Sequence, residues 1–195
     1  SQSWSQGRAV FGGLVAGLMV ARAEQLVNDS TKVLRSAFVS FVGPVASDTV
    51  TTLNAQILRQ GKSVVSVQVH LLQDGQVQSV LVASFGAARQ SSIEVLGSHE
   101  APQFKKPSES QPLPFLAGMT PNFFQHFDVV WSEGDLPFTG AKNPDFGGWM
   151  RFKAGEDIAK ITLPHLMVLG DTWPPAVLPM YTSMLPASSL ISKLA

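Results

Sequence analysis

Two hydrophobic patterns follow one another in the first half of the chain. Residues 11–27 are apolar on nearly every face at their start and become amphipathic around Arg22, Glu24 and Gln25. A helix that is apolar all round is one that other structure covers. Asn28, the first residue of a polar run, ends the pattern. The sequence therefore predicts a buried helix over 11–27.

Beyond residue 33 the apolar positions alternate with polar ones. In the clearest segment, Val65, Val67 and Val69 lie on one face and polar residues on the other. Asp74-Gly75 is a strong signal for a tight hairpin. The pattern predicts antiparallel strands, connected as a meander, at 34–42, 49–59, 64–72 and 77–85.

A proline-rich stretch separates this module from the rest. Its five prolines leave little room for a helix or a central strand. We expect a first module over 1–88, a surface linker over 89–122 and a second module over 123–195. The prolines are Pro102, Pro107, Pro112, Pro114 and Pro121.

The second module repeats the first in part. Its pattern predicts strands at 124–131 and 149–152, helices at 161–169 and 171–181, and the beginning of a strand at 188–195. Prolines stand in the first turn of the second of these helices, where they are tolerated.

The composition of the chain excludes several kinds of function and binding site. The chain has 195 residues, 45% hydrophobic and 14% charged, with a formal net charge of zero, which argues against a nucleic-acid binder. It contains no cysteine, which excludes disulfides and thiolate metal sites. The longest apolar run, 10–21, is shorter than the ~20 residues of a membrane span. His70, His99, His126 and His165 show no metal-ligand spacing, and we expect neither metal nor cofactor.

Five motifs, in order along the chain, resemble the tandem (double) hotdog acyl-CoA thioesterases of the type II thioesterase-like superfamily. They include a helix start with a double glycine, two strand sequences, a second double glycine and a sequence similar to the start of the second hotdog helix. The motifs are Gly7-Arg8-Ala9-Val10-Phe11-Gly12-Gly13, Leu34-Arg35-Ser36-Ala37-Phe38, Ala83-Ser84-Phe85, Gly147-Gly148-Trp149-Met150-Arg151 and Leu169-Gly170-Asp171-Thr172-Trp173-Pro174-Pro175-Ala176.

The resemblance implies an α+β hotdog fold: a central helix wrapped by an antiparallel sheet, in a double-hotdog arrangement whose second module is incomplete in this chain. It also implies a cytoplasmic enzyme that hydrolyses acyl-CoA. Because an incomplete module leaves a strand edge open, we expect a homo-oligomer or a partner chain that completes the second hotdog.

The resemblance also implies site residues. Asp171 matches the family's catalytic aspartate, and Ser188 is the best match for its hydroxyl residue, with Ser189 next to it. Gly12 and Gly13 are candidates for substrate binding through the backbone. Other interpretations stay open: Asp171 as a plain N-cap, the serines as strand-edge residues, and the glycines as a close-packed helix start.

The sequence departs from the family in two places. Leu14 stands where a glutamine often follows the double glycine. The family's second hotdog continues beyond the position of Ala195, and the catalytic glutamine of its final strand has no counterpart here. A non-catalytic hotdog protein that binds acyl chains or serves in assembly is therefore the alternative function. A hotdog hydratase is a third possibility, but no adjacent Asp and His support it.

Overall fold

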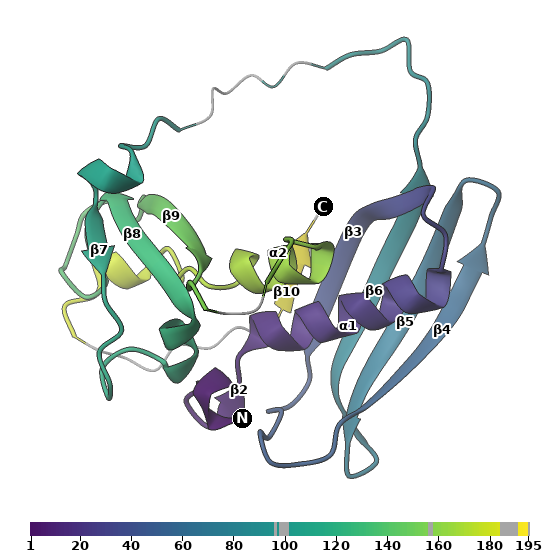
Figure 1. The fold of residues 1–195 in the computed structure, drawn as a ribbon, viewed down its shortest axis with the longest axis horizontal. Coiled ribbons are helices and arrows are strands. Elements are labelled where there is room, and N and C mark those ends of the chain that lie inside the picture. The colour runs from purple at the N-terminus through teal and green to yellow at the C-terminus, as the bar shows by residue number, and fades with distance from the viewer. Residues whose placement is uncertain (96, 98–101, 156–157, 184–190, 195) are drawn as a thin grey trace.

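A five-stranded antiparallel sheet and a long helix across it form the first half of the molecule (Figure 1). The computed structural model describes residues 1–95, 97, 102–155, 158–183 and 191–194. The elements are, in chain order, a 3₁₀ helix at Gln2–Trp4, β1 (Ser5–Gln6), β2 (Ala9–Val10), α1 (Gly12–Val27), β3 (Lys32–Phe41), β4 (Thr52–Gln60), β5 (Val64–Gln73), β6 (Gln76–Ala87), a 3₁₀ helix at Pro107–Glu109, β7 (Gln111–Leu113), a 3₁₀ helix at Asn122–His126, β8 (Phe127–Glu133), β9 (Gly147–Phe152), α2 (Leu163–Gly170), a 3₁₀ helix at Leu178–Met180 and β10 (Ile191–Leu194).

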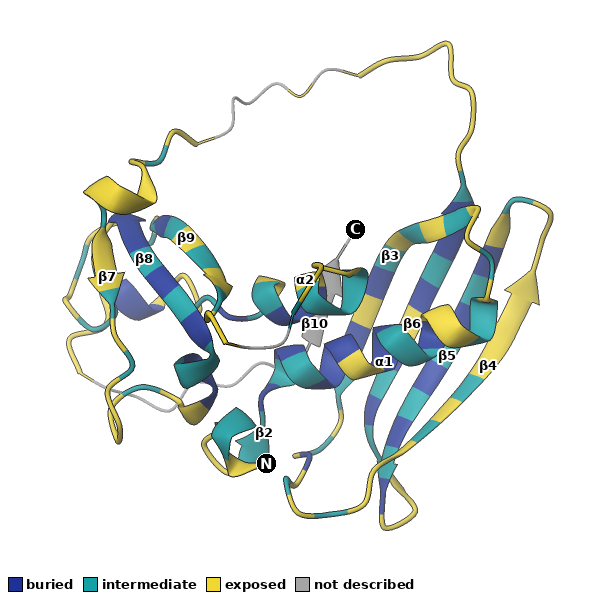
Figure 2. Ribbon diagram, in the orientation of Figure 1, coloured by how far each residue is buried: buried dark blue, intermediate teal, exposed yellow. Residues whose placement is uncertain are grey.

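The large sheet has the strand order β10-β3-β6-β5-β4, and α1 lies against β4, β5 and β6. Buried and exposed residues alternate along β5 and much of β6 (Figure 2). Val67, Val69 and Leu81 on the inner face are fully buried beneath Met19 and Val20 of the helix. The predicted helix wrapped by antiparallel strands is thus confirmed. No helix in the described part of the chain is long and apolar enough to cross a membrane.

Local sequence sets the ends of these elements. Asn28 ends α1 in the left-handed conformation, with φ 44°. Asp74 and Gly75 connect β5 to β6 with φ of 50° and 74°, the combination that a tight type I′ hairpin turn requires. The residues that predicted these ends therefore form them.

Helices α1 and α2 pack so closely that the backbone of one approaches the backbone of the other directly. A β-carbon on Gly13 would lie 2.9 Å from the carbonyl oxygen of Val168, and one on Gly17 would lie 2.9 Å from that of Pro164. Because these two glycines are one helical turn apart, they form a single groove on α1 that receives α2. No larger residue would leave room for this approach.

The two halves also meet through their strands. Each helix is followed along the chain by a strand, α1 by β3 and α2 by β10, and these two strands pair antiparallel with Ser192 opposite Val39. The contact therefore joins corresponding elements of two related modules.

A smaller sheet, in the order β7-β8-β9, carries the second hydrophobic cluster. The ring of Phe123 stacks on that of Phe11, with centroids 3.8 Å apart, and Val168 of α2 lies in the same cluster. Phe11 immediately precedes α1, so this cluster ties the start of the first helix to the second half of the molecule.

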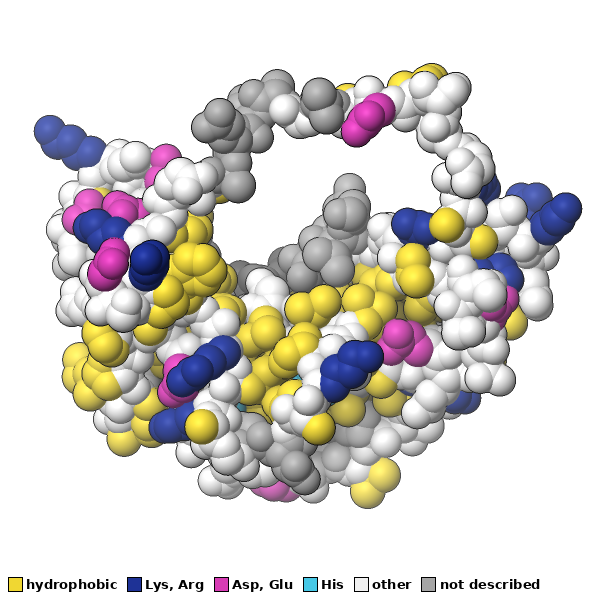
Figure 3. All heavy atoms as spheres, turned by 45° about the horizontal axis from the view of Figure 1, so that its top comes forward, with side chains coloured by type: hydrophobic (Ala, Val, Ile, Leu, Met, Phe, Trp, Pro, Cys, Tyr) yellow, Lys and Arg dark blue, Asp and Glu magenta, His cyan; other side chains and the backbone are white. Residues whose placement is uncertain are grey.

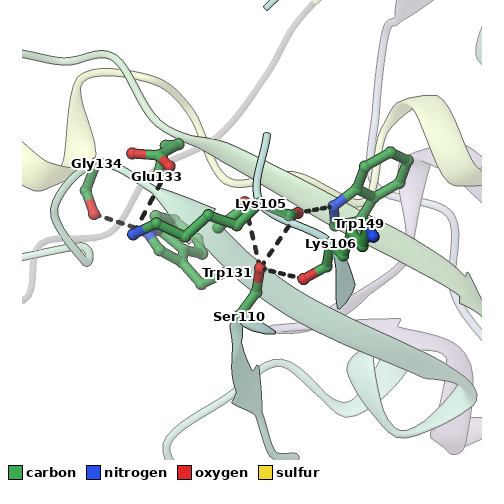
Figure 4. A network of polar contacts seen from close by, with 8 residues as sticks. Lys105, Lys106, Ser110, Trp131, Glu133, Gly134 and Trp149 are labelled. Atoms are coloured by element: carbon green, nitrogen blue, oxygen red, sulfur yellow. Dashed lines mark hydrogen bonds and ion pairs between the residues drawn. The ribbon is translucent and has the colours of Figure 1, made fainter. Parts of the chain in front are cut away.

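A network of polar contacts, with the Lys105 carbonyl group at its centre, holds the segment before β7 against the small sheet (Figure 4). The carbonyl oxygen of Lys105 accepts hydrogen bonds from the Trp149 indole at 2.7 Å and the Ser132 hydroxyl at 3.2 Å. Next to it the ring of Phe104 occupies the space above Gly147, where a β-carbon would lie 2.4 Å from the ring. Because Gly147 has no side chain, it leaves a socket that the Phe104 ring fills, and we call this contact the Phe104 anchor.

The structure differs from the sequence-based prediction in two places. The predicted helix over 171–181 is wrong: α2 ends at Gly170, and only a 3₁₀ turn at Leu178–Met180 follows. Pro174, Pro175 and Pro179 remove backbone donors and disfavour helical backbone in the residues before them. The stretch predicted as a linker contains β7, an edge strand in which Pro112 is tolerated.

The glycine groove makes a testable prediction. Gly17→Ala should lower the free energy of unfolding by about 1–3 kcal/mol, because its methyl group would collide with the Pro164 carbonyl. On an open helix the same change would stabilise. Gly170→Ala, at the end of α2 with no atom within 4 Å of the new methyl group, is the matched control and should leave the stability unchanged or raise it slightly. Urea unfolding of both variants measures the difference, and equal stabilities would contradict the groove.

Candidate functional site

Asp171 lies directly after α2, at the carboxyl end of that helix. The neighbouring Thr172 is buried and holds the turn: its hydroxyl donates to the Val168 carbonyl at 3.0 Å, and its N–H donates to the Leu169 carbonyl at 3.1 Å. The backbone at Asp171 is therefore fixed, and its side chain leaves the helix end in a defined direction.

The Asp171 carboxylate reaches the amino terminus of α1, in the other module. It accepts a hydrogen bond from the Gly13 N–H. A β-carbon on Gly12 would lie 2.9 Å from its Oδ2 atom, so only glycine lets the carboxylate come this close. The residue that precedes α1 is Phe11, which supplies no side-chain cap. Asp171 therefore caps α1 from a distant part of the chain, where the helix dipole favours a negative charge.

This arrangement corrects the expectation that Asp171 begins a helix of its own. The carboxylate does lie at a helix amino terminus between the two halves, but that helix is α1. The reason is that the prolines after Trp173 prevent a helix from beginning at Asp171.

Burial raises the pKa of Asp171 from 3.8 to about 6, and the hydrogen bond from Gly13 opposes this shift only in part. The described residues provide no ion pair for this carboxylate. A carboxyl group with such a pKa is ionised at neutral pH and is a stronger base than an exposed aspartate. The physical cause is that the protein removes water from the charge without supplying a cation.

Gly12 and Gly13 lie in the first turn of α1, beside this carboxylate. Phe41, at the end of β3, closes the other side: its ring would lie 3.0 Å from a β-carbon on Gly12. The structure thus brings Asp171, Gly12 and Gly13 together and adds Phe41, which the sequence analysis did not select. The apolar residue at the N-cap position was the available signal that α1 is capped from elsewhere.

Ser188 and Ser189 lie outside the described residues, and so does His99. The strand expected to begin at 188 is represented by β10, from Ile191.

The remaining histidines occupy separate places. His165 accepts a hydrogen bond from the Thr162 N–H and completes the cap of α2, while His126 stacks on Trp4. His70 belongs to β5. Within the described residues no three His, Cys, Asp or Glu side chains group as metal ligands would.

A groove of about 820 Å³ lies on the small sheet, lined by residues such as Leu113, Trp149 and Arg151. None of Asp171, Gly12 and Gly13 lines it. The groove is therefore separate from the site described above.

Two protein-family models match the chain, one in each half. Residues 1–86 match the acyl-CoA thioesterase N-terminal domain, and residues 107–191 match the acyl-CoA thioesterase C-terminal domain. No curated protein matches the chain.

Solved structures share the fold. A conserved protein of unknown function with a hot dog fold from Alicyclobacillus acidocaldarius is 20% identical, with a TM-score of 0.79, over 98% of this chain and 69% of that one. An acyl-CoA thioesterase II from Mycobacterium marinum is 22% identical, with a TM-score of 0.62, over 83% of this chain and 59% of that one. These likenesses establish the hotdog fold.

The raised pKa predicts a pH-dependent gain in stability from Asp171→Asn. The folded-state pKa lies above the unfolded value, so the ionised carboxylate costs the fold about 3 kcal/mol above pH 6 and nothing below about pH 4. The neutral amide avoids this cost and can still accept from Gly13. Thermal unfolding at pH 8 should show a higher Tm for the variant, and the gain should vanish at pH 4.

The exposed Asp48→Asn is the control and should leave the Tm unchanged at both pH values. A variant at Asp171 that is less stable at pH 8 would show that the charge–dipole interaction outweighs the desolvation.

Proposed function

Since this chain belongs to the acyl-CoA thioesterase family, we propose that it hydrolyses an acyl-CoA thioester to a free acid and CoA, with Asp171 orienting and deprotonating the attacking water. One observation carries the proposal: a half-buried carboxylate with a pKa of about 6 lies against the amino terminus of α1. A base and a set of backbone donors are thereby adjacent, as acyl transfer requires.

The first turn of α1 supplies the donors. The N–H groups of Leu14 and Val15 both point to the Phe11 carbonyl, and that of Gly13 donates to Asp171. The remaining N–H of this turn is that of Gly12. We assign it to the thioester carbonyl oxygen, which becomes negatively charged in the transition state and is favoured by the helix dipole.

The reaction then proceeds by general-base catalysis. Water attacks the thioester carbonyl carbon while its proton passes to the Asp171 carboxylate. The C–O bond forms, and the carbonyl electrons move onto the oxygen near Gly12. When this intermediate collapses, the C–S bond breaks, and the CoA thiolate takes up the proton from Asp171. The products are the carboxylic acid and the CoA thiol, and Asp171 is again ionised.

The proposed mechanism also needs a hydroxyl group that holds the water. On the resemblance to the family we assign this role to Ser188, which precedes β10 in the sequence. Its test is independent of Asp171: Ser188→Ala should lower kcat without moving the pH dependence.

Apolar surface adjoins the helix pair and suits a hydrocarbon chain. Leu18 of α1 and Leu166 of α2 are among the exposed large hydrophobic residues. Figure 3 shows hydrophobic side chains gathered in the hollow of the molecule between the two halves, with charged groups around them. An acyl chain in this region would leave the thioester near the start of α1.

Asp171→Asn should lower kcat by at least about a hundredfold while the protein stays folded, because an amide cannot accept the water proton. Free thiol released from acyl-CoAs of graded chain length measures the rate. Asp48→Asn is the matched control and should retain full activity. Undiminished hydrolysis by the Asp171 variant would remove this residue from the mechanism, whereas a parent protein that binds acyl-CoA without hydrolysis would favour an acyl-binding protein.

The pKa also predicts the pH profile of the parent enzyme. Only the ionised carboxylate is a base, so kcat/KM should be constant above about pH 7 and fall tenfold per pH unit well below pH 6. An inflection near pH 4 would indicate that an exposed carboxylate acts instead. Initial rates in a constant-ionic-strength buffer series distinguish the two.

A further inference from the structure

The Asp171 carboxylate is half-buried, so a small number of neighbouring groups decide how much water reaches it. Gly12 and Gly13, beside it at the start of α1, have no side chain that could cover it. The ring of Phe41 stands on the other side: it would lie 3.0 Å from a β-carbon on Gly12, and Asp171 Oδ2 would lie 2.9 Å from the same point. The ring and the carboxylate oxygen therefore border one small space, with no room for a side chain between them.

The side chains that follow the carboxylate along the chain are engaged elsewhere. The Thr172 hydroxyl donates to the Val168 carbonyl at 3.0 Å. The Trp173 ring packs edge-on against another tryptophan of the second half, with centroids 5.6 Å apart. Among the side chains described at this site, Phe41 is therefore the apolar group in a position to exclude water from the carboxylate.

The large sheet, and not the carboxylate, fixes the position of Phe41. It is the last residue of β3 and pairs with Ser79 of β6. Just after it, the N–H groups of Val42 and Gly43 both donate to the Gln78 carbonyl, at 2.8 and 2.9 Å. The Phe41 side chain also packs against the core of the first module. The ring is thus held in place from the first module, while Asp171 arrives from the second.

Charged groups of the described residues do not account for the environment of Asp171. The pKa of this carboxyl group responds to burial, which raises it, and to the Gly13 hydrogen bond, which lowers it. On α1, β3 and α2 the titratable side chains lie in the half of each element that is farther from Asp171, and β10 carries one lysine opposite Phe38. These side chains are Arg22 and Glu24 of α1, Lys32 and Arg35 of β3, His165 of α2 and Lys193 of β10.

We propose that Phe41 is a positioning residue for the reaction proposed above: its ring covers the Asp171 carboxylate and keeps this base partly dehydrated. The ring takes no part in the bond changes. Water stabilises the ionised form of a carboxyl group, so removal of the ring should make Asp171 more acidic and a weaker proton acceptor. The catalytic meaning of this inference rests on the proposed function, whereas the covering of the carboxylate can be measured without it.

Phe41→Ala admits water and should lower the pKa of Asp171 from about 6 toward 3.8, by about one unit or more. Phe41→Leu keeps an apolar side chain over the carboxylate and should retain most of the raised pKa. Heteronuclear NMR titration of the aspartate side-chain carboxyl groups measures these values and requires no activity. The spectrum of Asp171→Asn identifies the Asp171 signal.

Phe38→Ala is the matched control. This phenylalanine belongs to the same strand, is 39% exposed and points to the opposite face of the sheet, so its removal should leave the titration of Asp171 unchanged. Phe41→Gln is a second variant should Phe41→Ala fail to fold: it fills more of the space and brings an amide donor to the carboxylate, so it should also lower the pKa.

Three results would overturn the proposal: an Asp171 pKa near its ordinary value in the parent protein, an unchanged pKa in Phe41→Ala and Phe41→Gln, or an equal shift in Phe38→Ala. In the hydrolysis assay, the acid limb of kcat/KM should move to lower pH in Phe41→Ala by the same amount as the titration. An acid limb that stays in place would remove Phe41 from its role in the reaction. A shifted titration in a parent protein without hydrolysis would support the covering of Asp171 and refute the proposed function.

Discussion

The close contact between α1 and α2 is the constraint on which the rest of this structure depends. Gly13 and Gly17 let the α2 backbone come so close that carbonyl oxygens occupy the space of missing side chains. This close packing places the end of α2 beside the start of α1, so that the Asp171 carboxylate accepts a hydrogen bond from the Gly13 N–H. The same closeness places Val168 in the aromatic cluster with Phe11 and Phe123. If the two helices were farther apart, Asp171 would no longer reach Gly13, and Val168 would no longer lie in the aromatic cluster.

The electrostatics of Asp171 give it two opposing roles. As a negative charge at a helix amino terminus it favours α1, but its burial without a cation disfavours the folded state. Desolvation is the larger effect, and it also makes the carboxylate a useful base near neutral pH. The cost in stability and the proposed chemistry therefore have one origin.

Local signals in the sequence were enough to predict much of the first module. The alternation from Val65 to Leu71 and the Asp74-Gly75 turn correspond to β5, β6 and their hairpin, because both patterns depend on near neighbours. The helix expected from Asp171 does not form, and the reason is also local, because the prolines that follow remove backbone donors and disfavour helical backbone in the residues before them.

The site could be predicted only in part. Asp171 and Gly13 were both candidates, but their hydrogen bond joins residues from opposite halves of the chain, and no periodicity encodes such a contact. Phe41 was missed for the same reason: it looks like an ordinary strand residue until the fold brings its ring to Gly12. The position of Ser188 stays a prediction.

The Phe104 anchor has a consequence for how the connection between the modules can change in evolution. Residues 88–95 are exposed, and lengthening a loop there costs little entropy, about 0.6 kcal/mol for each doubling. From Phe104 onward, a single inserted residue would move the ring out of its socket above Gly147 and the Lys105 carbonyl away from Trp149. Insertions and deletions should therefore accumulate on the first-module side of the connection, while the few residues before β7 keep a fixed length.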